Sequence, residues 1–415
     1  MTSTTSEPVD VTTSSLYLDG FPHERFTAMR ETPGLTWHPY GDAGFWAITR
    51  HADVKEASKR PADFSSGIGH TNLWDLEPDA LEARRSILDT DAPDHTRLRR
   101  LVSKAFTPKA IRVWEDVTRQ ITCELLDDWM EKGGGDWVAE VAAPLPIRVI
   151  LTILGVPVED ADYLVEISNY LVEGTSDKPS LPADAYGNST ELRLLPFQSP
   201  ASHALYEYGE QLGAKRLADP QEDMVTMLVQ LEDDGDRLSH NEYRNFFHAL
   251  VFAGNETTRT AITHGAMAFA DNPDQWQRIL DDPAMVEPGV EELLRWATPV
   301  LHMRRTATAD TELAGTPIAA GDKVVMWYMS ANRDEAVFDD PFRFDVGRDP
   351  NPHLAFGGGG PHFCLGAFLA RMEVTVLVQE MRKRNMVLET RSPAVHAPSN
   401  FVHGVLAAEM GVSHG

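Results

Sequence analysis

Apolar residues recur at helical spacing along most of this chain, and the longest such stretch ends at Asp271. Ser239 and Glu242 form a capping-box pattern, in which a serine and a glutamate three residues later satisfy the free N–H groups of a helix start. Asn272–Pro273 ends the pattern, because proline cannot continue a helix. At about 1.5 Å per residue the predicted helix is about 50 Å long, enough to cross a whole domain.

One face of this predicted helix is apolar. The residues that share the face with Thr257 are all small or hydrophobic: Phe246, Ala249, Leu250, Ala253 and Gly254. They can pack into a core or form one wall of an apolar substrate pocket, and the pattern leaves both interpretations open.

Further helices and a few short strands are predicted around it. Helical patterns cover residues 95–106, 109–132, 140–174, 287–296 and 366–384, whereas 45–49, 301–330 (323–328 most clearly) and a short pair at the end of the chain favour strands. Residues 175–203 are rich in proline and serine and predict a long irregular loop, which often covers a binding site. We expect a mainly α fold, with one domain over residues 16–415 and a disordered tail at 1–15.

Charge and cysteine content limit the possible partners. The chain has 37 Lys and Arg against 63 Asp and Glu, a formal charge of −26, which argues against binding to nucleic acid or anionic membranes. No signal peptide and no apolar run of membrane-spanning length is visible. The two cysteines suggest a reducing compartment without disulfides, so we expect a cytoplasmic protein with Cys123 as an inert thiol in a helix.

The other cysteine, Cys364, lies in the glycine-rich stretch Phe356–Gly366, directly before a predicted helix. With no second thiol nearby, it can give one thiolate to one metal. The glycines permit close backbone approach to the sulfur, and the positive end of the helix should lower the pKa of the thiol. These features are typical of a thiolate ligand of haem iron. A phosphate-binding loop is the alternative, but no Gly-Lys-Ser/Thr follows the glycines.

The order Phe356, Gly360, His362, Cys364, Gly366 resembles the cysteine loop of the cytochrome P450 family. One extra glycine between the Phe and the Cys is similar to bacterial members that hydroxylate sterols and methyl-branched lipids. The resemblance spans nearly the whole chain and implies the P450 fold. It also implies haem b (iron protoporphyrin IX) bound through Cys364, with Phe356 packed against the sulfur side of the ring.

Two further segments match this family in the expected order. Glu292 and Arg295 resemble its Glu-x-x-Arg pair, and the resemblance implies that the segment 341–344 supplies a second arginine to them. The implied role of this group is structural, behind the cysteine loop.

The long predicted helix contains Ala253-Gly254-Asn255-Glu256-Thr257-Thr258. Glycine costs about 1 kcal/mol in a helix, and hydroxyls compete for backbone carbonyls, so we expect a local distortion here. The segment resembles the family's oxygen-activation motif. By that resemblance Gly254 would lie next to the haem, Thr257 would hydrogen-bond to dioxygen, and Glu256 would relay protons.

Haem propionates need cations when they are buried. The resemblance implies that four residues supply them: His95, Arg99, Arg305 and His362. Arg304 is adjacent to Arg305, so the sequence leaves open which of the two points toward the haem. His353 is a further candidate for binding a propionate. Each of these residues could instead be a solvated surface charge.

The sequence is less informative about the residues that contact the substrate. By resemblance, pocket residues also come from residues 68–74, from 175–203, from Val300–Leu301 and from Phe401–Val402. A pocket of this kind should accept a large apolar molecule such as a sterol, a terpenoid or a methyl-branched lipid.

No nucleotide-binding glycine motif follows a strand, so electrons must come from separate proteins. We expect NAD(P)H to supply them through a reductase and a ferredoxin, with the protein itself a monomer that binds O2. Arg97, Arg100, Lys104 and residues 382–384 are basic and could dock an acidic ferredoxin or merely be solvated. A peroxide-driven haem enzyme, a non-catalytic haem protein and a purely structural helical protein are the alternatives to a monooxygenase.

Overall fold

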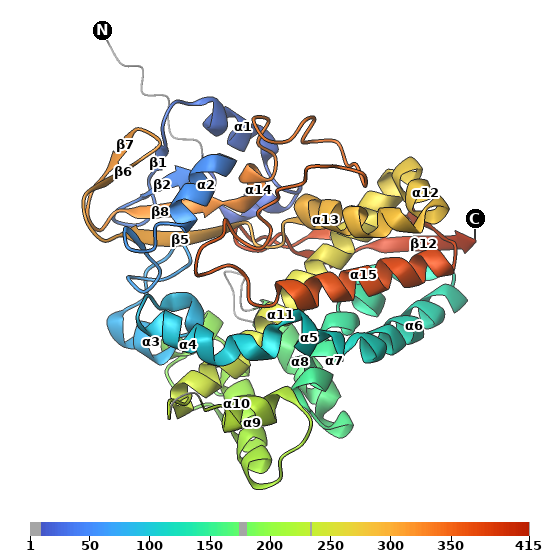
Figure 1. Cartoon of the computed structure of the whole chain (residues 1–415), viewed down its shortest axis with the longest axis horizontal. Coiled ribbons are helices and arrows are strands. Elements are labelled where there is room, and N and C mark those ends of the chain that lie inside the picture. The colour runs from blue at the N-terminus through green and yellow to red at the C-terminus, as the bar shows by residue number, and fades with distance from the viewer. Residues whose placement is uncertain (1–9, 174–180, 233–234, 415) are drawn as a thin grey trace.

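The computed structural model describes residues 10–173, 181–232 and 235–414 and confirms a mainly α fold (Figure 1). Helices make up most of the molecule, and a five-stranded sheet lies at one end. The helices are α1 (His23–Glu31), α2 (His51–Ser58), α3 (Pro78–Ala83), α4 (Asp94–Val102), α5 (Pro108–Arg112), α6 (Glu115–Glu131), α7 (Pro144–Leu154), α8 (Val158–Glu173), α9 (Pro200–Ala218), α10 (Met224–Gln230), α11 (His240–Asp271), α12 (Pro273–Asp281), α13 (Val286–Ala297), α14 (Tyr328–Ala331) and α15 (Ala367–Lys383).

Helix α11 is the axis of the fold and has the predicted bounds. The Ser239 hydroxyl accepts from the Glu242 N–H at 3.2 Å, and the Glu242 carboxylate accepts from the Ser239 N–H at 2.7 Å, which completes the capping box. The distortion predicted near Gly254 is absent, because α11 is α-helical throughout. The Thr257 hydroxyl does donate to the Ala253 carbonyl at 2.8 Å, but the helix accommodates this extra bond.

The largest sheet has the strand order β1-β2-β8-β5-β3, and only β2 and β8 pair in parallel. Every residue of β8 is buried, so neither face of this central strand is exposed to solvent. The strands of this sheet are β1 (Thr36–His38), β2 (Phe45–Ile48), β3 (Phe64–Ser65), β5 (His302–Ala307) and β8 (Lys323–Trp327).

Within the described part of the chain there are three smaller sheets, with strand orders β4-β12-β9, β6-β7 and β10-β11. The predicted strands at the end of the chain are therefore present, but β12 pairs with β4 and β9 rather than with its neighbour β11. Their bounds are β4 (Gly134–Asp136), β6 (Thr311–Leu313), β7 (Thr316–Ile318), β9 (Met386–Thr390), β10 (Val395–His396), β11 (Val405–Ala407) and β12 (Glu409–His414).

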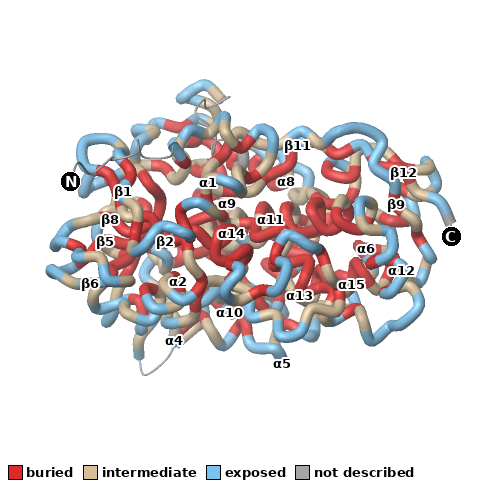
Figure 2. The backbone as a smooth tube through the Cα atoms, turned by 90° about the horizontal axis from the view of Figure 1, so that it is seen from above, coloured by how far each residue is buried: buried red, intermediate tan, exposed pale blue. Residues whose placement is uncertain are grey.

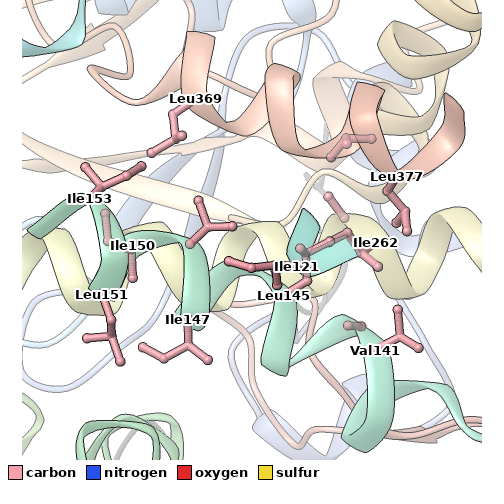
Figure 3. Close-up of a cluster of buried hydrophobic side chains, with 14 of the residues drawn as sticks. Ile121, Val141, Leu145, Ile147, Ile150, Leu151, Ile153, Ile262, Leu369 and Leu377 are labelled. Atoms are coloured by element: carbon pink, nitrogen blue, oxygen red, sulfur yellow. The ribbon is translucent and has the colours of Figure 1, made fainter. Parts of the chain in front are cut away.

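The main core surrounds α11, and Figure 2 shows buried backbone concentrated along this helix. Helix α7 contributes Ile147 and Ile150, and α15 contributes Leu369 and Leu377, which approach the core from opposite sides (Figure 3). A fully buried side chain of this size contributes about 1.5–3 kcal/mol. This packing fixes α11 relative to α15, the two helices that enclose the site described below.

A buried charge network lies behind the cysteine loop. Glu292 forms a bidentate pair with Arg295 at 2.7 and 2.8 Å, and neither side chain is exposed. The second arginine on Glu292 is Arg348, at 3.2 Å, so the prediction that segment 341–344 supplies it is wrong. Arg343, in that segment, contributes only its carbonyl, which accepts from both Arg295 and Arg348.

Some predicted boundaries also change. Of the tail predicted over 1–15, residues 1–9 lie outside the described residues, whereas Val11 is buried and its carbonyl accepts from the Tyr17 hydroxyl at 2.7 Å. The helix predicted over 140–174 is divided into α7 and α8 at Gly155, which has a left-handed φ of +75°. Of the loop predicted over 175–203, residues 175–180 lie outside the described residues, 181–199 contain short 3₁₀ turns, and α9 begins at Pro200.

Candidate functional site

The cysteine loop connects the region of the large sheet to α15. The Cys364 N–H donates to the Phe356 carbonyl at 3.0 Å, which closes the loop. Gly360 has a φ of +77° and lies against Ser58 of α2, where a Cβ would overlap the Ser58 carbonyl. The glycine is therefore needed for packing on α2, whereas the sequence analysis assigned such glycines to approach toward the sulfur.

Cys364 is enclosed by protein but exposed toward an apolar cavity between α11 and the start of α15. Burial raises the pKa of its thiol, and the Gly366 N–H and the charges of Arg99 and Arg371 only partly offset this effect. The predicted lowering of the thiol pKa is thus not found for the protein alone. The Arg371 guanidinium lies 4.4 Å from the centre of the Phe356 ring, which holds that ring beside the cysteine in the cavity wall.

The apolar face of α11 forms the wall opposite the cysteine. All five residues predicted for this face line the cavity together with Thr257: Phe246, Ala249, Leu250, Ala253 and Gly254. Ile87, Leu88, Val300 and Met303 line it as well, so apolar side chains surround most of the space.

A cluster of basic residues lines part of the cavity and contains all four predicted residues. The rings of His95 and His362 are 4.0 Å apart, and Arg99 donates to the Phe363 carbonyl at 2.6 Å. Arg305 donates to the Arg304 carbonyl at 2.7 Å.

This cluster lacks an anion. Among the described residues, neither Arg99 nor Arg305 has a carboxylate partner, and the buried Nε2 atom of His95 has no hydrogen bond. Burial and the nearby Arg305 lower the pKa of His362 to about 2, so a proton on this ring requires an added negative charge. The cluster can therefore accept an anionic group that enters from the cavity.

The two residues left open by the sequence are now placed. Arg304 forms an ion pair with Asp75 at 2.7 Å and does not line the cavity, so Arg305 is the inward arginine. His353 hydrogen-bonds to Glu291 at 2.9 Å outside the cavity, which excludes it from the cluster.

Thr257 and Glu256 lie on adjacent faces of α11. Thr257 lines the cavity, whereas Glu256 is buried behind the cavity wall, 3.6 Å from Arg259. Burial raises the pKa of Glu256 to about 7 despite the Arg259 charge. A carboxyl group with this pKa can hold or release a proton near neutral pH.

Three predicted pocket residues do not line the cavity: Leu301, Phe401 and Val402. Alternation along an extended chain explains the first, because Val300 faces the cavity and Leu301 packs into the core beside Trp327. The Leu301 N–H donates to the Phe401 carbonyl at 2.8 Å, so residues 401 and 402 support this edge through their backbone. The strand alternation was the available signal for choosing Val300 over Leu301.

Comparison with known proteins decides the family. The sequence model of cytochrome P450 matches residues 203–387. A steroid C26-monooxygenase of Mycolicibacterium smegmatis is 38% identical over 95% of this chain and 92% of its own length. A methyl-branched lipid omega-hydroxylase of Mycobacterium tuberculosis is 41% identical over 91% of this chain and 88% of its own. This chain belongs to the cytochrome P450 family.

Solved P450 structures agree with this assignment. A Mycobacterium marinum cytochrome P450 in complex with pseudoionone superposes with a TM-score of 0.86 at 37% identity, over 98% of both chains. This P450 is thus a monooxygenase, an oxidoreductase that incorporates oxygen from O2, as the resemblance implied. Within the described residues, no helix is both long and apolar enough to span a bilayer.

The family implies haem, and the residues of the cavity fit it. Cys364 offers one sulfur to the cavity, the walls are apolar, and the unpaired cations with the free His95 Nε2 would meet two propionates. A flat, apolar group with an anionic edge satisfies each of these features.

Proposed function

We propose that this P450 hydroxylates a large, apolar, branched substrate such as a sterol, a terpenoid or a methyl-branched lipid. The observation that carries the proposal is the continuous apolar wall of α11, which faces the cysteine across the cavity. Relatives at 38% and 41% identity are named for steroid and methyl-branched lipid oxidation, which supports the same chemical class.

The chain's own residues would divide the work as follows. Cys364 would hold haem b through its sulfur, and Phe356 would shield that sulfur from water. His95, Arg99, Arg305 and His362 would bind the propionates. When bound, the haem supplies the redox chemistry that activates O2. The apolar residues of α11 orient the substrate and exclude bulk water from it.

Thr257 and Glu256 would manage protons. The Thr257 hydroxyl is at the cavity surface, where it can hydrogen-bond to a polar group beside the substrate. Glu256 is one residue away, outside the cavity, with a pKa of about 7. This arrangement supports a role in which the Glu256 carboxyl group supplies protons to the Thr257 hydroxyl while remaining out of contact with the substrate.

Electrons would come from NAD(P)H through a reductase and a ferredoxin. Phe363 and Phe368, at the cysteine end of α15, are 37% and 49% exposed, and α5 with the exposed Lys109 and Arg112 packs beside α15. An acidic partner fits such a face. Arg97 contributes less than the sequence indicated, because it already pairs with Asp236 and Glu242.

Binding titrations test the substrate class. Sterols and methyl-branched lipids should shift the haem absorption of the purified protein, and product should form with O2, a ferredoxin and NAD(P)H. Leu250→Trp places a larger side chain in the cavity and should abolish the shift. Leu301→Met, outside the cavity, should preserve it. Equal binding of small polar compounds, or turnover only with peroxide, would contradict the proposal.

A further inference from the structure

A second row of side chains on α11 runs beside the cavity wall. Glu256, Thr260 and His264 are spaced four residues apart, which places them one above the other along the helix. All three are buried. Among the residues that the structure describes, none forms a hydrogen bond with the Oε2 atom of Glu256 or the Oγ1 atom of Thr260, and Arg259 at 3.6 Å is too far from that Oε2 to donate one.

The β10–β11 hairpin covers this row. Gly404 lies beside the carboxyl group, because a Cβ there would be in ordinary contact with Oε1 of Glu256, at 3.5 Å. Next to it, the carbonyl of His403 accepts from Nε2 of His264 at 2.9 Å, and the two rings stack with centroids 3.9 Å apart. The hairpin thus lies against the carboxyl group, and the adjacent histidine joins the hairpin to α11.

A third imidazole extends the row toward the surface. The ring of His396 is 6.2 Å from that of His264 and 6.4 Å from that of His403, and its Nδ1 atom is buried without a partner. His396 and His403 are both partly exposed, and the neighbouring Val395 is on the surface. The row therefore begins at solvent and ends at Glu256.

Unpartnered polar atoms along one line are unusual in a protein interior. Buried polar groups are normally hydrogen-bonded, and where protein partners are missing, ordered water usually supplies the bond. Water next to Glu256, Thr260 and His396 would join the side chains into a continuous hydrogen-bonded chain.

The imidazoles of this row are neutral near neutral pH, because burial disfavours their charged form. Burial lowers the pKa of His264 to about 4 and also lowers the pKa values of His403 and His396. The charged and titratable groups that face the row are Arg259, Arg333, His23 and Asp19. Nε2 of His264 donates to the His403 carbonyl and Nδ1 of His403 donates to the Ala297 carbonyl, so the second nitrogen of each neutral ring can accept a hydrogen bond from water.

We propose that His396, His403, His264 and Thr260 hold a chain of water molecules that carries protons from solvent to Glu256, separate from the substrate cavity. One proton enters at the hairpin, each water molecule accepts one proton and releases another to the next, and Glu256 changes from carboxylate to carboxylic acid, with no electrons exchanged. The histidines and Thr260 are positioning residues, because they act through Glu256. The inference rests on the proposed role of Glu256 as the proton source for Thr257.

The test uses Thr260→Val and His264→Phe in the haem-loaded protein, with His248→Phe as the matched control. His248 is a buried histidine on the same helix, eight residues before Glu256 and therefore beyond the inner end of the row, and its ring bonds to Ser202 at 3.0 Å. Infrared spectroscopy at pH about 6, where a carboxyl with a pKa of about 7 is mainly protonated, follows hydrogen–deuterium exchange of the Glu256 carboxylic acid, and Glu256→Gln assigns its band.

Both row variants should slow this exchange by about tenfold or more, while His248→Phe leaves it unchanged. They should also raise the solvent isotope effect on turnover and divert electrons from product. His264→Gln, which can still donate to the His403 carbonyl and accept from water, should restore both stability and much of the exchange rate lost in His264→Phe. Exchange as fast in Thr260→Val and His264→Phe as in the parent would overturn the route.

The two proposals fail in different ways. If Glu256→Gln keeps full coupling of electrons to product, the role of Glu256 is wrong, whatever the exchange rate. If Glu256→Gln loses coupling while the row variants keep both coupling and fast exchange, Glu256 receives protons by another path and only the route is wrong.

Discussion

Replacement of Glu292 by glutamine should be among the most destabilising single changes in this P450. Its carboxylate is completely buried and binds Arg295 through two hydrogen bonds and Arg348 at 3.2 Å. It also accepts from the Asp345 N–H at 2.9 Å and from Asn351 at 3.2 Å. Glutamine keeps the size but removes the charge, so two buried guanidinium groups lose their counter-ion.

Breaking a buried ion pair by removal of one partner costs about 3–5 kcal/mol. That loss is a large part of the about 5–15 kcal/mol that stabilises a typical domain. Asp345 and Asn351, which hydrogen-bond to Glu292, lie in the segment that leads into the cysteine loop. Loss of these bonds should therefore lower haem retention together with stability.

The neighbouring Glu291 provides the matched control. It pairs with Arg371 at 2.6 Å and with His353, but its side chain is 34% exposed. Exposed pairs contribute about 0–1 kcal/mol, so Glu291→Gln should cost much less. Urea unfolding followed by circular dichroism measures both free energies of unfolding. A cost for Glu292→Gln below about 1 kcal/mol, or equal to that for Glu291→Gln, would refute the reasoning.

Three further predictions concern the propionate cluster, the cysteine loop and Glu291. Arg305→Leu should speed haem transfer to apomyoglobin, because a propionate loses its buried cation, whereas Arg304→Leu, outside the cavity, should change the transfer rate little; equal rates would contradict this assignment. Gly360→Ala should lower the haem content of the purified protein, measured by absorbance, because its Cβ would overlap the Ser58 carbonyl, and full haem content would show that the loop can shift. The pKa of Glu291 is lowered to about 2, so its contribution to stability is present above pH about 4.5 and is lost as the pH falls toward 2; the stability difference between the parent and Glu291→Gln should shrink over that range, and a constant difference would contradict the linkage.

The sequence was sufficient where local pattern determines structure. The capping box at Ser239 and the apolar face of α11 depend on neighbours within the helix, and both were predicted correctly. The cysteine loop was recognisable because its residue order is unusual in itself. The four basic residues were named by resemblance, and the structure brings them together in the cavity wall.

The errors arose where distant parts of the chain decide the outcome. The segment 341–344 contains an arginine, but Arg348 reaches Glu292, and only the path of the intervening loop distinguishes them. The pKa of the Cys364 thiol is raised because burial outweighs the helix end and the nearby arginines, a balance that sequence spacing does not reveal. The histidine row also escaped notice, because His264 and His403 are 139 positions apart.

The central claim is that the sulfur of Cys364 holds the haem. The most direct test is the absorption spectrum of the reduced protein exposed to carbon monoxide, with Cys364→Ser and Cys123→Ser measured beside it. Cys123 hydrogen-bonds to Glu380 outside the cavity, so its replacement should leave the spectrum unchanged. A strongly red-shifted Soret band that disappears only in Cys364→Ser is the predicted result. A band typical of a neutral ligand in the folded parent protein, or a red-shifted band that survives in Cys364→Ser, would contradict the account.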